Sequence, residues 1–133
     1  MVTAPGTPLL RLPFDAGAES PRRVRRAFLT HFADHECLEV MLLCLSEVVS
    51  NAVLHAGTGG VVVVTRVGDG VRVEVADGSA ARPVRRHFQD VSPTGRGLHL
   101  LDRLSDRWGI DPTPDAAGGG KVVWFEITSG GTG

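Results

Sequence analysis

The sequence predicts an α/β domain, a two-layer sandwich in which helices cover one face of a mixed, mainly antiparallel sheet. Apolar residues recur with helical spacing in the first half of the chain. In the second half they alternate with polar residues or form short continuous runs, and both patterns are typical of strands. The elements follow the order β-α-α-β-β-loop-α-β-β, which favours a sheet covered on one side. The chain has 133 residues, 42% of them apolar, which suits a single core.

The composition excludes several classes of protein. The formal net charge is −1 and 22% of the residues are charged. Nucleic-acid-binding proteins commonly have a basic face, which a net charge near zero does not suggest. Disordered chains commonly have a high net charge, which this sequence also lacks. No apolar stretch is long enough for a membrane span, and residues 1–8 lack the pattern of a signal peptide. We therefore expect a cytoplasmic protein with no direct nucleic-acid or membrane partner.

The first elements are an edge strand and a helix. Residues 1–8 form a loose N-terminal lead, and the domain begins with a short strand at 9–14. Pro13 cannot donate to a strand ladder, so this strand belongs at an edge of the sheet. Ser20, followed by a proline, predicts the N-cap of a helix that continues to about residue 34.

A second helix follows, with apolar residues repeating at i, i+3, i+4 and i+7 from Leu38 onward. It ends at Gly57, which we expect in the C′ position. Most of its remaining surface is also apolar, so we expect it to be buried. Cys37 and Cys44 lie two turns apart along one face, too far for a disulfide, which predicts buried free thiols.

Strands dominate the rest of the chain. Residues 60–67 are apolar and β-branched, and a glycine-rich turn joins them to a strictly alternating strand at 71–77. Residues 78–96 show no period, and a loop of this length is unusual unless it has a function. The remaining elements are a helix from Leu98 to Leu104, a strand at 107–110, a final strand at 122–127 that closes the domain (9–127), and a flexible tail at 128–133.

A polar stripe crosses the second helix. Glu47, Asn51 and His55 are spaced four residues apart, which places them on one face of an otherwise apolar cylinder. A glutamate in a helix commonly just faces solvent, and that interpretation stays open. The other interpretation is a hydrated divalent cation, to which Asn51 gives its carbonyl oxygen while Glu47 orients or deprotonates a nucleophile.

Asp77 ends the alternating strand at a position that faces the core. It either caps a turn together with Gly78 or is a recessed acceptor for an amino group of a ligand, such as the exocyclic amine of adenine. Further along, Thr94, Gly95, Arg96, Gly97 and Leu98 precede and open a helix. Two glycines there let backbone amides approach an anion at a helix N-terminus, although such pairs are also common in ordinary loops.

Taken together, these segments resemble the motifs of the GHKL ATPase/kinase superfamily. Residues 46–56, which read SEVVSNAVLHA, are similar to its N box, S-E-x-x-x-N-A-x-x-H-A. The G1 box, the G2 box and the terminal G-x-x-V-W-F strand correspond to residues 77–79, 94–101 and 120–125. The similarity is greatest to the short, single-domain bacterial members, the anti-sigma factor serine-protein kinase group.

The resemblance implies the Bergerat ATP-binding fold, with Mg²⁺ and ATP in a pocket under a mobile lid at residues 80–94. By this match Glu47 is the catalytic base, Asn51 ligates Mg²⁺, and Asp77 accepts from the adenine amine. The other residues implied to bind the cofactor are Gly78, Thr94, Gly95, Arg96, Gly97 and Leu98, with Gly95 and Gly97 along the phosphates. Arg96 pairs with a phosphate or is a solvated side chain.

The function implied is an ATP-dependent serine/threonine protein kinase that phosphorylates an anti-sigma factor antagonist protein and binds a sigma factor. A homodimer is a further implication of the resemblance. The alternative is a nucleotide-binding interaction module with little catalysis, and the retained Glu47 favours the kinase. The sequence departs from the family near the last strand. Many members have a threonine there that supports the adenine contact, whereas this chain has Lys121, Val122 and Val123 in that neighbourhood. The resemblance therefore implies that the contact is lost or passes through water.

Overall fold

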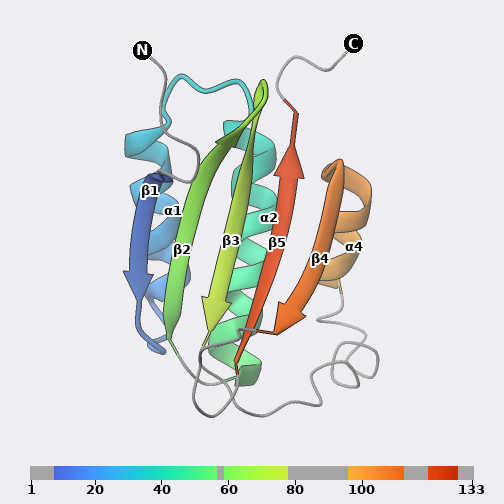
Figure 1. Ribbon diagram of the computed structural model, residues 1–133. Coiled ribbons are helices and arrows are strands. Elements are labelled where there is room, and N and C mark those ends of the chain that lie inside the picture. Colours follow the sequence, from blue (N-terminus) through green and yellow to red (C-terminus); the bar gives the residue numbers. More distant parts are fainter. Residues whose placement is uncertain (1–7, 57–58, 78–95, 113–119, 129–133) are drawn as a thin grey trace.

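Five strands form one sheet in the part of the chain that the computed structural model describes, residues 8–56, 59–77, 96–112 and 120–128. Their order is β1-β2-β3-β5-β4, and each of the four pairings is antiparallel (Figure 1). The α/β class is confirmed, and the sheet of the described residues is antiparallel rather than mixed. The strands are β1 (Pro8–Phe14), β2 (Gly60–Val67), β3 (Gly70–Asp77), β4 (Arg107–Pro112) and β5 (Lys121–Ile127).

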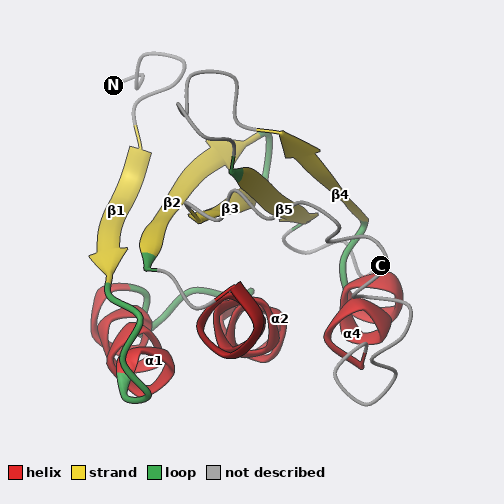
Figure 2. Ribbon diagram, turned by 90° about the horizontal axis from the view of Figure 1, so that it is seen from below, coloured by secondary structure: helices red, strands yellow, loops and turns green. Residues whose placement is uncertain are grey.

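The helices lie together on one face of this sheet, with α2 between the other two (Figure 2). This is the two-layer sandwich expected from the order of elements. After α2 the chain continues without a break in a π-helical segment, η1 (Ala52–Ala56). The α-helices of the described residues are α1 (Ser20–His31), α2 (Leu38–Asn51) and α4 (Arg96–Leu104).

The core lies between the two layers. Every second residue of the central strands faces the helices, so the alternating pattern decides which side of each strand is buried. Each large apolar side chain removed from water there stabilises the fold by about 1.5–3 kcal/mol. Fully buried members from both layers are Phe28, Met41, Leu45, Val49, Val62, Val64, Val73, Val75, Leu101 and Phe125.

Both cysteines are buried and free, as predicted. Burial raises the pKa of the Cys44 thiol to about 12, because a thiolate is poorly solvated in the core. Burial also raises the pKa of Cys37, and the negative charges of Glu36 and Asp106 act in the same direction. Neither thiol has the lowered pKa of a reactive cysteine.

The first helix begins one residue earlier than predicted. Its N-cap is Glu19, and the side chain of Ser20 caps nothing. Ser20 is buried instead, and its hydroxyl lies 2.7 Å from the main-chain oxygen of Asp15 and 2.8 Å from Asp15 Oδ1. The hydroxyl of Ser20 therefore bonds to Asp15, in the segment between β1 and α1, and does not cap the helix. The helix ends at His31, short of the expected residue 34.

Other boundaries follow the sequence more closely. β1 begins at Pro8 and is an edge strand, as Pro13 predicts. The hairpin between β2 and β3 is also confirmed, with Gly68 at φ +57°, where glycine has no steric penalty. The predicted lead (residues 1–7), the lid and the tail (129–133) lie outside the described residues.

The second face of the sheet carries a charged network. Arg72 on β3 donates to Glu74 Oε2 at 2.9 Å and to Glu126 Oε2 at 2.8 Å, and Arg107 on β4 lies 3.3 Å from Glu126 Oε1. The guanidinium of Arg72 also lies 4.1 Å from the ring centre of Trp124, a cation–π contact. These side chains tie β3, β5 and β4 together on the side away from the helices, since their positions alternate with the buried ones that face the core.

Candidate functional site

Four segments that carry the predicted site residues converge at one end of the sheet. The last turn of α2, the Asp77 end of β3, the start of β5 and the start of α4 all lie toward the lower end of the view in Figure 1. They come together because β3 runs toward this end, α2 ends there, and β5 and α4 begin there. Segments far apart in the sequence thus supply one site.

Glu47 and Asn51 lie one turn apart on α2, and both are half-buried. Within the described parts of the chain, neither side chain makes a hydrogen bond or an ion pair. A half-buried carboxylate beside a half-buried carboxamide is therefore available for a ligand or for water. The stripe predicted for these two residues is confirmed.

The expectation that α2 is buried on nearly all sides is wrong. Its sheet-facing side is buried, but Leu43 is 49% exposed, and Leu54, in the π-helical continuation, is 70% exposed. A helix in a single layer on a sheet keeps an outer face, which periodicity alone does not reveal. Glu47 and Asn51 therefore lie where a ligand from solvent can reach them, and that suits a binding site better than full burial.

The chain beyond Asn51 departs from α-helical geometry. Residues Ala52–Ala56 form η1, in which each turn takes up an additional residue. The side chain of His55 lies outside the described residues, so the stripe is established for Glu47 and Asn51 only. Such π-helical turns occur frequently at functional sites.

Asp77 lies where the strand alternation predicts, on the helix-facing side and only 6% exposed. Directly opposite on β5 is Lys121, whose Nζ donates to Asp77 Oδ2 at 2.5 Å. The side chains of Asp77 and Lys121 are 3% and 13% exposed. The carboxylate expected to bind adenine thus belongs to a buried ion pair.

The sequence analysis did not identify Lys121 as a member of the site. A signal was present, since Lys121 precedes Val123, Phe125 and Ile127 in the inward alternation of β5 and is the only lysine in the chain. The signal becomes specific only with the register that pairs β3 with β5. At the place where the sequence departs from the family pattern, the structure therefore has Lys121 in contact with Asp77, the predicted adenine acceptor.

The predicted phosphate loop is described only in part. Arg96, Gly97 and Leu98 form the first turn of α4, so the helix begins two residues before the expected Leu98. Helix N-termini favour anions because their first N–H groups have no partner within the helix. Gly78, Thr94 and Gly95 lie outside the described residues, as does the turn in which Gly78 would let Asp77 act as a cap.

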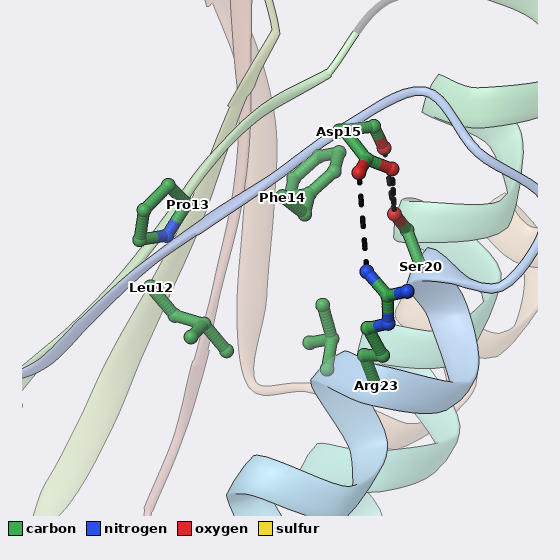
Figure 3. Close-up of a pocket in the computed structure, with 7 residues that line it drawn as sticks. Leu12, Pro13, Phe14, Asp15, Ser20 and Arg23 are labelled. Atoms are coloured by element: carbon green, nitrogen blue, oxygen red, sulfur yellow. Dashed lines mark hydrogen bonds and ion pairs between the residues drawn. The ribbon is translucent and has the colours of Figure 1, made fainter.

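Two hollows lined by described residues lie elsewhere. One, of about 410 Å³, lies where β1 leads into α1 and is lined by Leu12, Phe14 and Asp15 among others (Figure 3). The N–H of Gly17, the hydroxyl of Ser20 and the charge of Arg23 lower the pKa of Asp15 in its rim. These contacts join β1 to α1. A second hollow, of about 520 Å³, has Ser46 and Ser50 on its α2 side, and the candidate residues line neither.

The donor set is compatible with Mg²⁺ held mainly by a ligand. No group of three or more His, Cys, Asp or Glu side chains gathers as a metal site in the described residues. Mg²⁺ commonly takes one or two protein oxygens and completes its shell with phosphate and water. The side-chain oxygen of Asn51, which has no other described partner, fits that role.

Comparison with known proteins agrees with the architecture. The family model described as a histidine kinase-like ATPase domain matches residues 14–127, from the end of β1 to the end of β5. No curated protein sequence matches this chain significantly. Separately, no helix of the described residues is long and apolar enough to cross a membrane. Because the family match spans most of the chain, the protein belongs to the histidine kinase-like ATPase domain family of the GHKL superfamily.

Proposed function

We propose that this protein is an ATP-dependent serine/threonine protein kinase of the anti-sigma factor type. The observation that supports the proposal is that Glu47 and Asn51 are half-buried and without described partners on α2, a helix that ends toward the same end of the sheet as β3 and the start of α4. Family membership makes nucleotide binding the expected use of this arrangement.

Each residue has a task that its position permits. Asn51 would hold Mg²⁺, which when bound neutralises phosphate charge. Asp77 accepts from the adenine amine at the sheet end, and the N–H groups at the start of α4 approach the phosphates. Glu47, one turn before Asn51, accepts the proton of an attacking hydroxyl. Phosphoryl transfer depends mainly on positioning and charge neutralisation, which a small domain can supply.

The hydroxyl comes from a partner protein. By the resemblance of the motifs, that partner is a small anti-sigma factor antagonist, which is phosphorylated on a serine or threonine. A sigma factor is the second partner, bound in alternation. We also propose, on the same resemblance, that the protein dimerises.

Two measurements test the proposal in sequence. Calorimetry with ATP and Mg²⁺ should give saturable binding, and no binding at millimolar ATP would exclude a nucleotide site. Transfer of label from γ-labelled ATP to candidate antagonist proteins from the native host should follow. Binding without transfer to any candidate would favour the other candidate function, a nucleotide-binding module that holds a regulatory partner.

A further inference from the structure

The hollow of about 520 Å³ between α1 and α2, which are neighbours in the helical layer, is lined by hydrogen-bond donors (Figure 2). Its α1 side carries Arg22 and Arg25, and its α2 side carries Ser46 and Ser50. Residues three or four apart in a helix share a face, so each helix contributes both of its side chains to the same hollow. Two guanidinium groups and two hydroxyl groups therefore surround one space, and all four can donate.

These four side chains have no partner in the part of the chain that the structure describes. Neither arginine forms an ion pair there, not even with Glu19, the acidic residue of the lining. A serine in a helix often donates to the carbonyl group four residues earlier, but Ser46 and Ser50 make no such bond within the described residues. The donors of the hollow are thus available to a ligand or to water.

The charge of the hollow favours an anion. The lining has two arginines and one glutamate, which leaves one positive charge in excess. The N-terminus of α1 adds to this preference, because the first N–H groups of a helix lack partners within the helix and its dipole favours negative charge. Glu19 is the N-cap of α1 but makes no side-chain hydrogen bond to the helix, and the first turn contains no acidic residue.

A phosphoryl group suits these donors better than a carboxylate does. Arginine pairs with both groups through two N–H donors at once. A carboxylate presents two oxygens, however, whereas a phosphoryl group presents three strong acceptors and so can also accept from the hydroxyl groups. The volume of the hollow falls in the range of small-molecule pockets, so a phosphoryl group attached to a larger molecule fits there as well as free phosphate.

We propose that the hollow between α1 and α2 binds a phosphoryl group, with the two arginines pairing with its oxygens and the two serines donating hydrogen bonds to it. The site is separate from the proposed nucleotide site, since Glu47 and Asn51 do not line this hollow. The inference therefore does not depend on the proposed kinase function. The phosphoryl group comes either from free phosphate or from a phosphorylated serine side chain, which share this chemistry.

A titration of the full chain followed by NMR provides the first test. Phosphate added at constant ionic strength should shift the backbone amide signals of the four lining residues and saturate in the millimolar range, whereas chloride should not. N-acetyl-O-phosphoserine amide distinguishes the two sources. Tighter binding of this compound than of phosphate would identify a phosphorylated side chain as the ligand, and equal or weaker binding would identify free phosphate. Its unphosphorylated form should not bind.

Charge-matched variants provide the second test. Arg25→Gln should weaken phosphate binding about threefold to tenfold, because one exposed guanidinium group no longer pairs with the anion. Arg26→Gln is the matched control, since it removes the same charge from an exposed position on the same helix, but Arg26 lines a different hollow. It should change the affinity only slightly. Ser50→Ala should weaken binding by a smaller factor than Arg25→Gln.

The outcomes separate this inference from the proposed function. The absence of saturating shifts at the lining residues would overturn the phosphoryl site, as would shifts confined to other parts of the chain. Equal weakening by Arg25→Gln and Arg26→Gln would also overturn it, because phosphate would then respond only to the overall charge of α1. The amide spectrum of each variant shows whether the fold is retained. Failure of ATP to bind would contradict the proposed function and leave this inference standing.

Discussion

The indole of Trp124 on β5 lies against the backbone of Gly109, its register partner on β4. A Cβ added at position 109 would lie 2.8 Å from Trp124 Cζ2 and 2.9 Å from Nε1. The ring is held in place, since its Nε1 donates to Asp111 at 3.1 Å and Arg72 lies over it. Glycine is thus required at position 109 because the side chain of Trp124 on the neighbouring strand occupies the space of a Cβ, and not because of the backbone conformation of residue 109.

Gly109→Ala should therefore destabilise the fold by about 1–3 kcal/mol, the usual range for overpacking a well-packed contact. Urea denaturation measures the change. The matched background is Trp124→Phe, which lacks the atoms that the new methyl group meets. An equal loss in both backgrounds would show that the indole is not the cause.

Asn51→Ala should remove the Mg²⁺-dependent part of ATP affinity and leave metal-free binding nearly unchanged. The reason is that Asn51 supplies the protein oxygen for the ion, while the base and phosphates have other contacts. Calorimetry with Mg²⁺ and with EDTA measures both parts. Ser50→Ala is the control, because Ser50 lines the hollow beside α1. An identical response of wild type and Asn51→Ala to EDTA would contradict the assignment.

Glu47→Gln should abolish phosphate transfer and leave ATP affinity equal or slightly improved. A general base contributes about a hundredfold to ten-thousandfold in rate, whereas its negative charge repels the triphosphate in the bound state. Label transfer and calorimetry on the same protein give the two values. Glu39→Gln, in the exposed first turn of the same helix, should change neither. Equal labelling by wild type and Glu47→Gln would exclude Glu47 as the base.

Asp77→Asn should weaken ATP binding by about 2 kcal/mol or more, since a charge-assisted acceptor becomes a carboxamide. It should also lower stability, because Lys121 loses its buried counter-charge. Calorimetry and urea denaturation separate the two effects. Glu74→Gln, on the same strand but facing away from the helices, is the control for affinity. A loss of stability with unchanged affinity would show that Asp77 has a structural role, in the ion pair with Lys121 or as a turn cap, and does not bind adenine.

Because burial raises the pKa of the Cys44 thiol, we expect a specific dependence of the free energy of unfolding on pH. Its pKa is raised by burial from the ordinary 9.0 to about 12, so the unfolded chain loses this proton first as the pH rises. The free energy of unfolding should therefore be insensitive to Cys44 below pH 9 and should fall between pH 9 and 12, by at most about 1.4 kcal/mol per unit.

Urea denaturation of wild type and Cys44→Ala across pH 8 to 10.5 measures this difference. The chain has no tyrosine, so thiolate absorbance can be followed without phenolate interference. The variant is expected to be less stable at pH 8 and to show the shallower decline above pH 9. Parallel curves for the two proteins would show that Cys44 ionises equally in both states.

Local patterns predicted the elements well because burial of one face leaves a periodic record in the sequence. The alternation of β3 placed Asp77 on the helix-facing side, and the four-residue spacing placed Glu47 with Asn51. What failed depends on contacts that no local pattern contains. Ser20 turned to Asp15, and Lys121 meets Asp77 across 44 residues of sequence.

The wrong prediction that α2 is buried on nearly all sides has the same origin. Its apolar periodicity predicts a buried side, but the number of elements packed around a helix is a property of the whole fold. The exposure of Leu43 and Leu54 thus became apparent only with the layers in place. The π-helical turn after Asn51 has no signal that periodicity could detect.

The order of the strands also affects how the protein acquires its site during folding. β2 with β3 and β4 with β5 can pair early, but β1 meets β2, and β3 meets β5, only after the intervening chain has closed into a large loop, with Phe14 opposite Gly60 and Asp77 opposite Lys121. Closing such a loop is entropically unfavourable until its contacts form, and pairing of this kind is slow. The proposed nucleotide site, which includes Asp77 of β3, is thus assembled only when the centre of the sheet is complete, so the ability to bind nucleotide would report that folding has finished.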